Sequence, residues 1–271
     1  MIEDYTPTLT VPQSLEARRV PDSRFARAYA RTGDRGRAIV KSAIAALYEA
    51  REPSRGVRGE STAHHAAGRR TLRTAPRPWF LLALDPQAHS PIQLAAAVVP
   101  AVSARAELIL AARPAGKGGW PDAQLAALEL CGVEHVFSPS TMALRHGIVE
   151  LAEASGPGLL ACLGDRAFCD RLLAGLDDSC DVIRLPAPAK AALHADSAWD
   201  REALGFAQPG LELVEYANPG DPEVSGLRAA FAPDAFAPSG AALILEPGRE
   251  ALWDWPQLES GLFFTRTLVY G

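Results

Sequence analysis

Two polar side chains follow the first long apolar run of the chain, and they are the best-placed candidates for a polar site. Residues 79–84 are continuously apolar, Asp85 comes directly after them, and His89 stands four positions further on. Both side chains can exchange hydrogen bonds with a ligand. In α/β sheets ligands bind at the carboxyl ends of the strands, so we expect Asp85 and His89 to contribute to a cofactor site.

The other chemically active residue types form no known catalytic or metal-binding pattern. His64 and His65 lack a third ligand at a diagnostic spacing, so we interpret them as a solvated pair. The Gly-rich turn 116–119 could place an anion at the start of the next helix, and a plain surface turn is the simpler interpretation. The sequence has no phosphate-binding loop motif and no nucleophile elbow. The catalytic residues therefore stay unknown, and no metal ligand is assigned.

The cysteine content favours a reducing compartment. None of the four cysteines belongs to a C-x-x-C pair, and we expect them to be small buried hydrophobes: Cys131, Cys162, Cys169 and Cys180. The chain opens without an apolar run behind a basic flank, so we expect no signal peptide and a cytoplasmic location. No stretch approaches the roughly 18 uninterrupted apolar residues of a membrane span, which argues against a membrane partner.

Charge is unevenly distributed along the 271 residues. Residues 1–77 contain fourteen Arg and one Lys against eight acids, whereas the remainder is acidic. A basic segment can bind nucleic acid, but here the arginines alternate with acids and no aromatic stacking pattern accompanies them. We therefore expect no nucleic-acid partner, and we expect the basic arm to pack on an acidic surface of its own or of a partner subunit.

The order and spacing of the apolar segments predict the fold. Residues 1–21 suggest an extended arm, 22–49 a helix broken at Gly33 and Gly36, and 51–77 a polar linker. From residue 78 on, short apolar runs alternate with segments of helical periodicity, which is typical of βαβ units. Continuous apolar strands indicate a sheet covered on both faces. The prediction is a three-layer, mostly parallel Rossmann-like α/β domain at 78–271, preceded by an N-terminal helical arm and linker at 1–77.

The later part of the chain gives less regular signals. We expect helices at 221–231 and 250–258, strands at 211–216 and 241–245, and a closing strand at 268–270.

Three stretches between residues 90 and 137 resemble the nucleotide-binding-type domain of the histidinol dehydrogenase family, within the aldehyde-dehydrogenase-like superfamily. S-P-I-Q-L at 90–94 is similar to that family's first helix after a proline-containing loop. L-I-L-A-A-R-P at 108–114 is similar to its next strand and turn. L-C-G-V-E-H-V-F at 130–137 resembles its L-A-G-V-D-E-I-Y. A Rossmann-like fold is what this resemblance implies.

A second patch near the C-terminus extends the resemblance to site residues. Ser239 resembles a substrate-contacting serine of the family, and Q-L-E-S-G at 257–261 resembles the family's zinc-binding Q-A-E-H-G. The resemblance therefore implies Ser239 and Gln257 as substrate- or ligand-binding residues. Ser260 replaces the zinc-binding histidine, and a neutral hydroxyl is a poor zinc ligand. The domain that carries the family's Glu-His catalytic pair and remaining metal ligands follows beyond the region of resemblance.

Other family features are absent from the sequence. The loop after the first strand is Gly-rich in the family, whereas residues 85–89 here contain no glycine. Phe263 and Phe264 run into the last strand without the nucleophilic cysteine of aldehyde dehydrogenases.

Three hypotheses follow. The first is a degenerate relative without zinc or catalysis that serves as a binding or regulatory protein and self-associates, as a dimer, through its N-terminal helices. The second is an oxidoreductase that uses NAD(P) or acyl-CoA in the crevice near Asp85, Ser239 and Gln257, so NAD is retained as a candidate cofactor. The third is a subunit whose site a separate partner completes.

Overall fold

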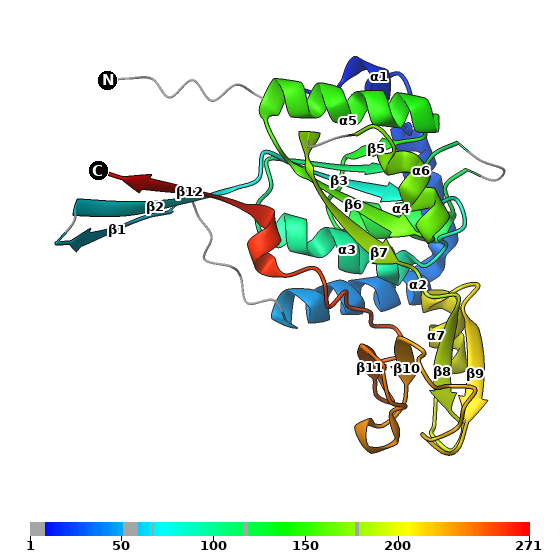
Figure 1. Ribbon diagram of the computed structural model, residues 1–271. Coiled ribbons are helices and arrows are strands. Elements are labelled where there is room, and N and C mark those ends of the chain that lie inside the picture. The colour runs from blue at the N-terminus through cyan, green and yellow to red at the C-terminus, as the bar shows by residue number, and fades with distance from the viewer. Residues whose placement is uncertain (1–8, 51–58, 67, 116–118, 177–178) are drawn as a thin grey trace.

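The chain folds as a three-layer α/β structure with mostly parallel sheets, as expected from the sequence (Figure 1). The computed structural model describes residues 9–50, 59–66, 68–115, 119–176 and 179–271. Within this part of the chain the strands form a five-stranded parallel sheet, a four-stranded parallel sheet and a three-stranded antiparallel ribbon. The prediction of one parallel sheet is wrong, because periodicity in the sequence does not reveal where a run of parallel strands divides into two sheets.

The five-stranded sheet has the strand order β5-β4-β3-β6-β7. Its strands are β3 (Trp79–Leu84), β4 (Leu108–Ala112), β5 (His135–Phe137), β6 (Leu159–Gly164) and β7 (Asp181–Pro186). The chain moves outward from β3 to β5 and then returns to the other side of β3 with β6. The point between β3 and β6, where the direction of winding reverses, is the place at which such sheets bind ligands.

Helices cover both faces of this sheet. One face packs against α3 (Pro91–Ser103) and α4 (Asp122–Leu130), and the other packs against α5 (Thr141–Ser155) and α6 (Arg166–Leu173). Every residue of β3 is buried, which explains its unbroken apolar sequence. The start of α3 is set by Ser90, whose Oγ accepts from the Gln93 N–H at 2.9 Å, and by Pro91 in the first turn.

The second parallel sheet has the order β11-β10-β8-β9 and lies beside α2 and α7 in Figure 1. It consists of β8 (Lys190–His194), β9 (Glu212–Tyr216), β10 (Ala229–Phe231) and β11 (Leu243–Leu245), with α7 (Arg201–Ala207) between β8 and β9 and the short turn η2 (Asp234–Phe236) after β10. The predicted strands at 211–216 and 241–245 are confirmed, and β8 was not foreseen. The predicted helices at 221–231 and 250–258 are wrong, because Pro222 and Gly226 in the first segment and Pro256 in the second favour turns.

The long helix α2 (Asp22–Ala50) packs against α3 and α4 of its own chain. It is kinked at Gly33, which has a φ of +68°. The break predicted at Gly36 is wrong, because Gly36 is helical and allows close packing: a Cβ there would lie 2.8 Å from the Phe206 ring on α7. The apolar stripe of α2, formed by Val40, Ile44 and Leu47, is therefore buried within the chain.

The segment predicted as an extended arm contains a short helix, α1 (Gln13–Glu16), within its described residues. Leu15 is fully buried and packs on α5 at Gly147, where a Cβ would lie 2.6 Å from Leu15 Cγ. The prolines in this segment favoured the prediction of an extended arm. A four-residue helix also has too little periodicity to be recognised in the sequence. Residues 1–8 lie outside the described residues.

The segment predicted as a linker forms a β-hairpin over its described residues, which corrects that prediction. β1 (Gly59–His65) and β2 (Gly68–Pro76) pair antiparallel, and β12 (Phe264–Tyr270) pairs with β2 after the turn η3 (Ser260–Phe263). The hairpin could not be recognised in the sequence, because polar residues stand on both faces of its strands and apolar and polar residues do not alternate. The strand that pairs with β2, β12, also lies about 190 residues away in sequence. The whole of β1 is exposed, including His64 and His65, and residues 51–58 lie outside the described part.

Among the described residues, no helix is both long enough and apolar enough to cross a membrane.

We predict that Leu15→Ala lowers the free energy of unfolding by about 2–4 kcal/mol, because it leaves a cavity between α1 and α5. Urea unfolding followed by circular dichroism measures this value. The control is Met142→Ala on α5, whose side chain is 80% exposed, with an expected change under about 0.5 kcal/mol. Equal, small effects for the two variants would show that α1 does not dock.

Candidate functional site

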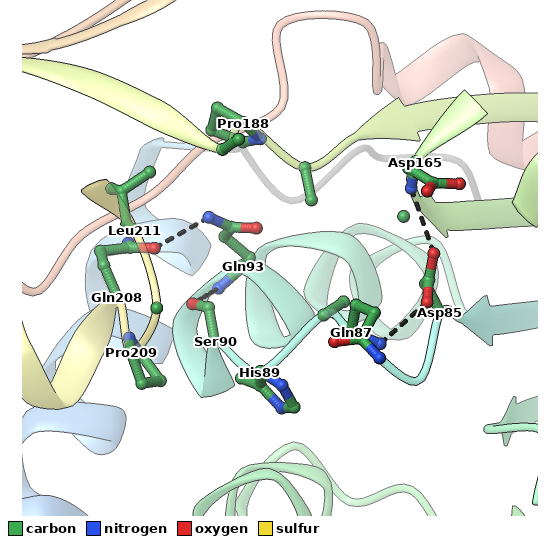
Figure 2. A pocket seen from close by; sticks show the side chains of 15 residues that line it. Asp85, Gln87, His89, Ser90, Gln93, Asp165, Pro188, Gln208, Pro209 and Leu211 are labelled. Carbon is green, nitrogen blue, oxygen red and sulfur yellow. Dashed lines mark hydrogen bonds between the residues drawn. The ribbon is translucent and has the colours of Figure 1, made fainter. Parts of the chain in front are cut away.

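A pocket of about 420 Å³ opens at the point between β3 and β6 where the winding of the five-stranded sheet reverses (Figure 2). The loop between β3 and α3 forms one side, to which Gly164, the last residue of β6, and Asp165, which follows it, are added. The segment 187–189, which joins the two parallel sheets, and the turn 208–211 after α7 form the other side. Asp85 and His89 both line this pocket, so the structure brings together the two residues that the sequence analysis assigned to a cofactor site.

The carboxylate of Asp85 connects the two sides of this point of reversal. Asp85 is 5% exposed, and its Oδ1 accepts a hydrogen bond from the Gln87 N–H at 2.8 Å. Its Oδ2 lies 3.4 Å from the backbone N of Asp165, at the start of α6. Gly164 makes this approach possible, since a Cβ at that position would lie 2.3 Å from Asp85 Cβ. Figure 2 shows both hydrogen bonds converging on the one side chain.

Backbone groups that bind phosphate in related folds already have partners inside this chain. Phosphates bind at helix N-termini through free N–H groups and the positive end of the helix dipole. Here the Gln93 N–H at the start of α3 bonds to Ser90 Oγ, and the Phe168 N–H at the start of α6 bonds to Asp165 Oδ1 at 2.6 Å. One N–H at each helix start is thus already bonded, and the Asp85 carboxylate beside these helix starts would repel a phosphate.

A buried arginine fixes the shape of the loop that carries Asp85 and His89. Arg113 is 5% exposed, and its guanidinium donates to the carbonyl oxygens of Pro86 at 2.6 Å and Ala88 at 2.8 Å. It also donates to Gln124 Oε1, and Gln124 Nε2 donates back to the Ala88 carbonyl. Burial lowers the pKa of Arg113, and nearby Asp85 opposes this effect. The loop is thus held by its backbone, which leaves its side chains for the pocket.

His89 projects at the rim of the pocket with an imidazole that favours the neutral form. Partial burial lowers its pKa from the ordinary value of 6.5, the Arg113 charge lowers it further, and the Asp85 carboxylate raises it. The ring is consequently neutral near pH 7, with one nitrogen that donates and one that accepts.

The opposite end of the pocket is built from amides. Gln93 Nε2 donates to Gln208 Oε1 at 2.8 Å, and Ser90 Oγ donates to the Ala207 carbonyl at 2.6 Å, so α3 is tied to the end of α7. Gln208 is 4% exposed, and its Nε2 has no hydrogen-bond partner among the described residues. A buried donor normally has an acceptor, so this amide is suited to meet an acceptor from a ligand.

The pocket residues beyond Asp85 and His89 were missed by sequence reasoning. Gln93 and Gln208 lie 115 positions apart, and nothing in the sequence shows that they pair. Asp165 could have been found, because it follows a buried strand in the same way as Asp85 does.

The structure separates the two residues implied by the family resemblance from this pocket. Ser239 is exposed in the loop before β11, and it does not line the pocket beside Asp85. Gln257 is exposed and lines a different hollow, together with Arg166, Arg184 and Arg228. The oxidoreductase hypothesis assumed that Asp85, Ser239 and Gln257 share one crevice. In the structure they do not.

The remaining candidates lie elsewhere. All four cysteines are buried, and burial raises the pKa of Cys131 to about 12. Glu134 and His135 stand at the amino end of β5, away from the strand ends that form the pocket. His135 Nδ1 lies 2.9 Å from Arg19 Nη2. The Gly-rich turn is described only at Gly119, since 116–118 lie outside the described residues.

Neither group that the family resemblance implies fits the residues present. Zinc takes uncharged nitrogen, thiolate or carboxylate donors, whereas Gln257 stands among three arginines. No three His, Cys, Asp or Glu side chains of the described residues come together as a metal site would require. For NAD, the pyrophosphate would meet the Asp85 carboxylate and occupied N–H groups.

Comparison with known proteins supports the fold alone. No family model matches the sequence, and no curated protein matches it significantly. Among solved structures, histidinol dehydrogenase from Elizabethkingia anophelis superposes with a TM-score of 0.59 at 9% identity, over 93% of this chain and 76% of that one.

Aldehyde dehydrogenases are also similar, at lower scores. The enzyme from Brucella melitensis biovar abortus 2308 gives a TM-score of 0.41 at 15% identity, over 67% of this chain and 41% of that one. The NADP-dependent glyceraldehyde-3-phosphate dehydrogenase from Bacillus halodurans C-125 gives 0.41 at 15% identity, over 78% of this chain and 47% of that one. This chain thus spans less than half the length of these two structures. The histidinol dehydrogenase match confirms the α/β fold that the sequence predicted, and at 9% identity it shows the fold alone.

We predict that His89 titrates below pH 6.5 in the folded protein, because burial and Arg113 both disfavour its protonation. The NMR chemical shift of its Cε1–H against pH measures this, with His89→Gln for assignment. Asp85→Asn should lower the midpoint further, because it removes the one neighbour that favours the charged form. A midpoint at or above 6.5 in the native protein would contradict this geometry.

Proposed function

We propose that this protein binds a small polar molecule in the pocket between β3 and β6 and that it does not catalyse a dehydrogenase reaction. The observation that carries the proposal is the position of the Asp85 carboxylate, which bonds to the Gln87 and Asp165 amides where a dinucleotide phosphate would otherwise bind. Asp85 and Asp165 both line the pocket. Their carboxylates would have to move away before the phosphates of NAD(P) could bind at this place.

The charges of the pocket point to the class of ligand. Asp85 and Asp165 supply negative charge at one end, and His89 stays neutral beside them. Such an end favours an ammonium group or hydroxyl groups, which can donate to carboxylates. At the other end Gln208 Nε2 requires an acceptor. An amino alcohol, an amino acid or a polyol satisfies both ends, and a pocket of about 420 Å³ admits molecules of this size.

The first experiment is a titration calorimetry panel with NAD, NADP and acetyl-CoA on one side and amino alcohols, amino acids and polyols on the other. We predict heat and a raised melting temperature only with members of the second group. Saturable binding of NAD or NADP, with hydride transfer to it from an alcohol or aldehyde, would instead establish an oxidoreductase and refute the proposal.

Asp165→Asn is the variant that tests the charge of the pocket. Asparagine caps a helix as well as aspartate does, so α6 keeps its start while the pocket loses one negative charge. We predict that the affinity for an ammonium ligand falls by about 10-fold, in line with a hydrogen bond to a charged group. Asp200→Asn, which replaces the equivalent cap of α7 outside the pocket, is the matched control and should leave affinity unchanged.

Self-association as a homodimer is also proposed, through the ribbon rather than through the buried α2. The ribbon of β1, β2 and β12 stands away from the body in Figure 1, and β1 pairs on one side only among the described residues. An edge strand of this kind is a template for a second strand.

We predict that Ala63→Lys, which adds charge to the exposed edge, converts a dimer to a monomer in analytical ultracentrifugation. Identical sedimentation of the two proteins would refute this interface.

A further inference from the structure

A second hollow lies on the other side of the segment 187–189, which closes the polar pocket. It has two connected parts, because Pro186, Arg228, Pro256 and Gln257 line both of them. The wider part has a volume of about 750 Å³ and the narrower part about 310 Å³. The two parts differ in character, since three arginines line the wider part, whereas most of the residues that line the narrower part are apolar.

Three guanidinium groups line the wider part. Arg184 Nη2 lies 3.2 Å from Asp170 Oδ1, and Arg166 Nε lies 3.5 Å from Asp170 Oδ2, so one carboxylate positions two of the arginines. The guanidinium of Arg228 has no ion pair among the described residues, although it lines both parts. Among the described residues that line this part, three positive charges thus face one carboxylate, and the surplus favours an anion.

Two tryptophans line the narrower part. Their ring centroids lie 5.7 Å apart, and Trp255 Nε1 donates to the Gln93 carbonyl at 2.9 Å. Trp253 is 2% exposed, and its Nε1–H has no acceptor among the described residues. Asp254 also lines this part, and its Oδ1 accepts from the Trp255 N–H at 2.7 Å. A buried indole N–H without an acceptor is unusual in a folded protein, and it offers a bonding partner to whatever enters.

We propose that this double hollow binds a small organic anion with an apolar body. The anionic head lies among Arg166, Arg184 and Arg228, because guanidinium groups match planar oxyanions with paired hydrogen bonds. The apolar body extends toward Trp253, whose N–H meets an acceptor on the ligand. Gln257 faces the head as an amide donor, which gives this residue a role other than the metal ligation implied by the family resemblance.

The proposal is independent of the function assigned to the polar pocket, because the two sites prefer ligands of opposite charge.

Calorimetry and tryptophan fluorescence with three probes test the proposal. Naphthoate combines a carboxylate with an apolar ring, naphthalenemethanol keeps the ring without the charge, and acetate keeps the charge without the ring. We predict saturable binding of naphthoate with a change in tryptophan emission, and binding of each reference compound at least about 10-fold weaker. Equal affinity for naphthoate and naphthalenemethanol would overturn the role of the arginines.

Three variants test whether naphthoate binds in this double hollow. Arg228→Gln should weaken naphthoate binding by about 10-fold, since the Arg228 guanidinium has no ion pair with the residues that the structure describes. Arg171→Gln, on the exposed face of α6 and outside the hollow, is the control and should have no effect. Trp253→Phe should weaken binding by about 3-fold or more, because it removes the indole N–H that meets the ligand's acceptor. Loss of stability with unchanged affinity in Trp253→Phe, or equal effects of the two arginine variants, would refute the site.

Discussion

The carboxylate of Asp85 joins the ends of β3 and β6 at the place where the winding of the sheet reverses. It accepts from the Gln87 and Asp165 amides, and Gly164 gives it room because any Cβ there would collide with it. Parallel strands end with unpaired amides and helix dipoles that attract an anion, and most such folds leave that position for a ligand. In this chain an internal anion occupies it, and the chemistry of the surrounding pocket follows from that.

The segment 187–189, which connects the two parallel sheets, separates two sites of opposite charge. On one side, the internal carboxylate makes the pocket acidic and directs it toward ligands that donate hydrogen bonds. On the other, the segment 187–189 backs a cationic hollow whose arginines are held by Asp170. The fold resembles that of histidinol dehydrogenase, but the residues at its strand ends suit neither a pyrophosphate nor a zinc ion. Fold and chemistry are thus separable in this chain.

Local sequence patterns predicted what depends on local physics. The buried strand β3 and the alternation of strands and helices were evident, and so was the position of Asp85 and His89 at a strand end. The division into two parallel sheets, the pairing of β2 with β12 and the Gln93–Gln208 contact depend on residues far apart in sequence, and no local pattern encodes them. Ser239 and Gln257 were named by resemblance alone, and the structure places them apart from the pocket.

The most direct test of this account is a crystal structure of the protein soaked with a high concentration of ADP. The account predicts that Asp85 keeps its hydrogen bonds to the Gln87 and Asp165 amides and that no phosphate lies at the start of α3 or α6. A diphosphate bound at either helix start, with the Asp85 side chain displaced from the two amides, would contradict it.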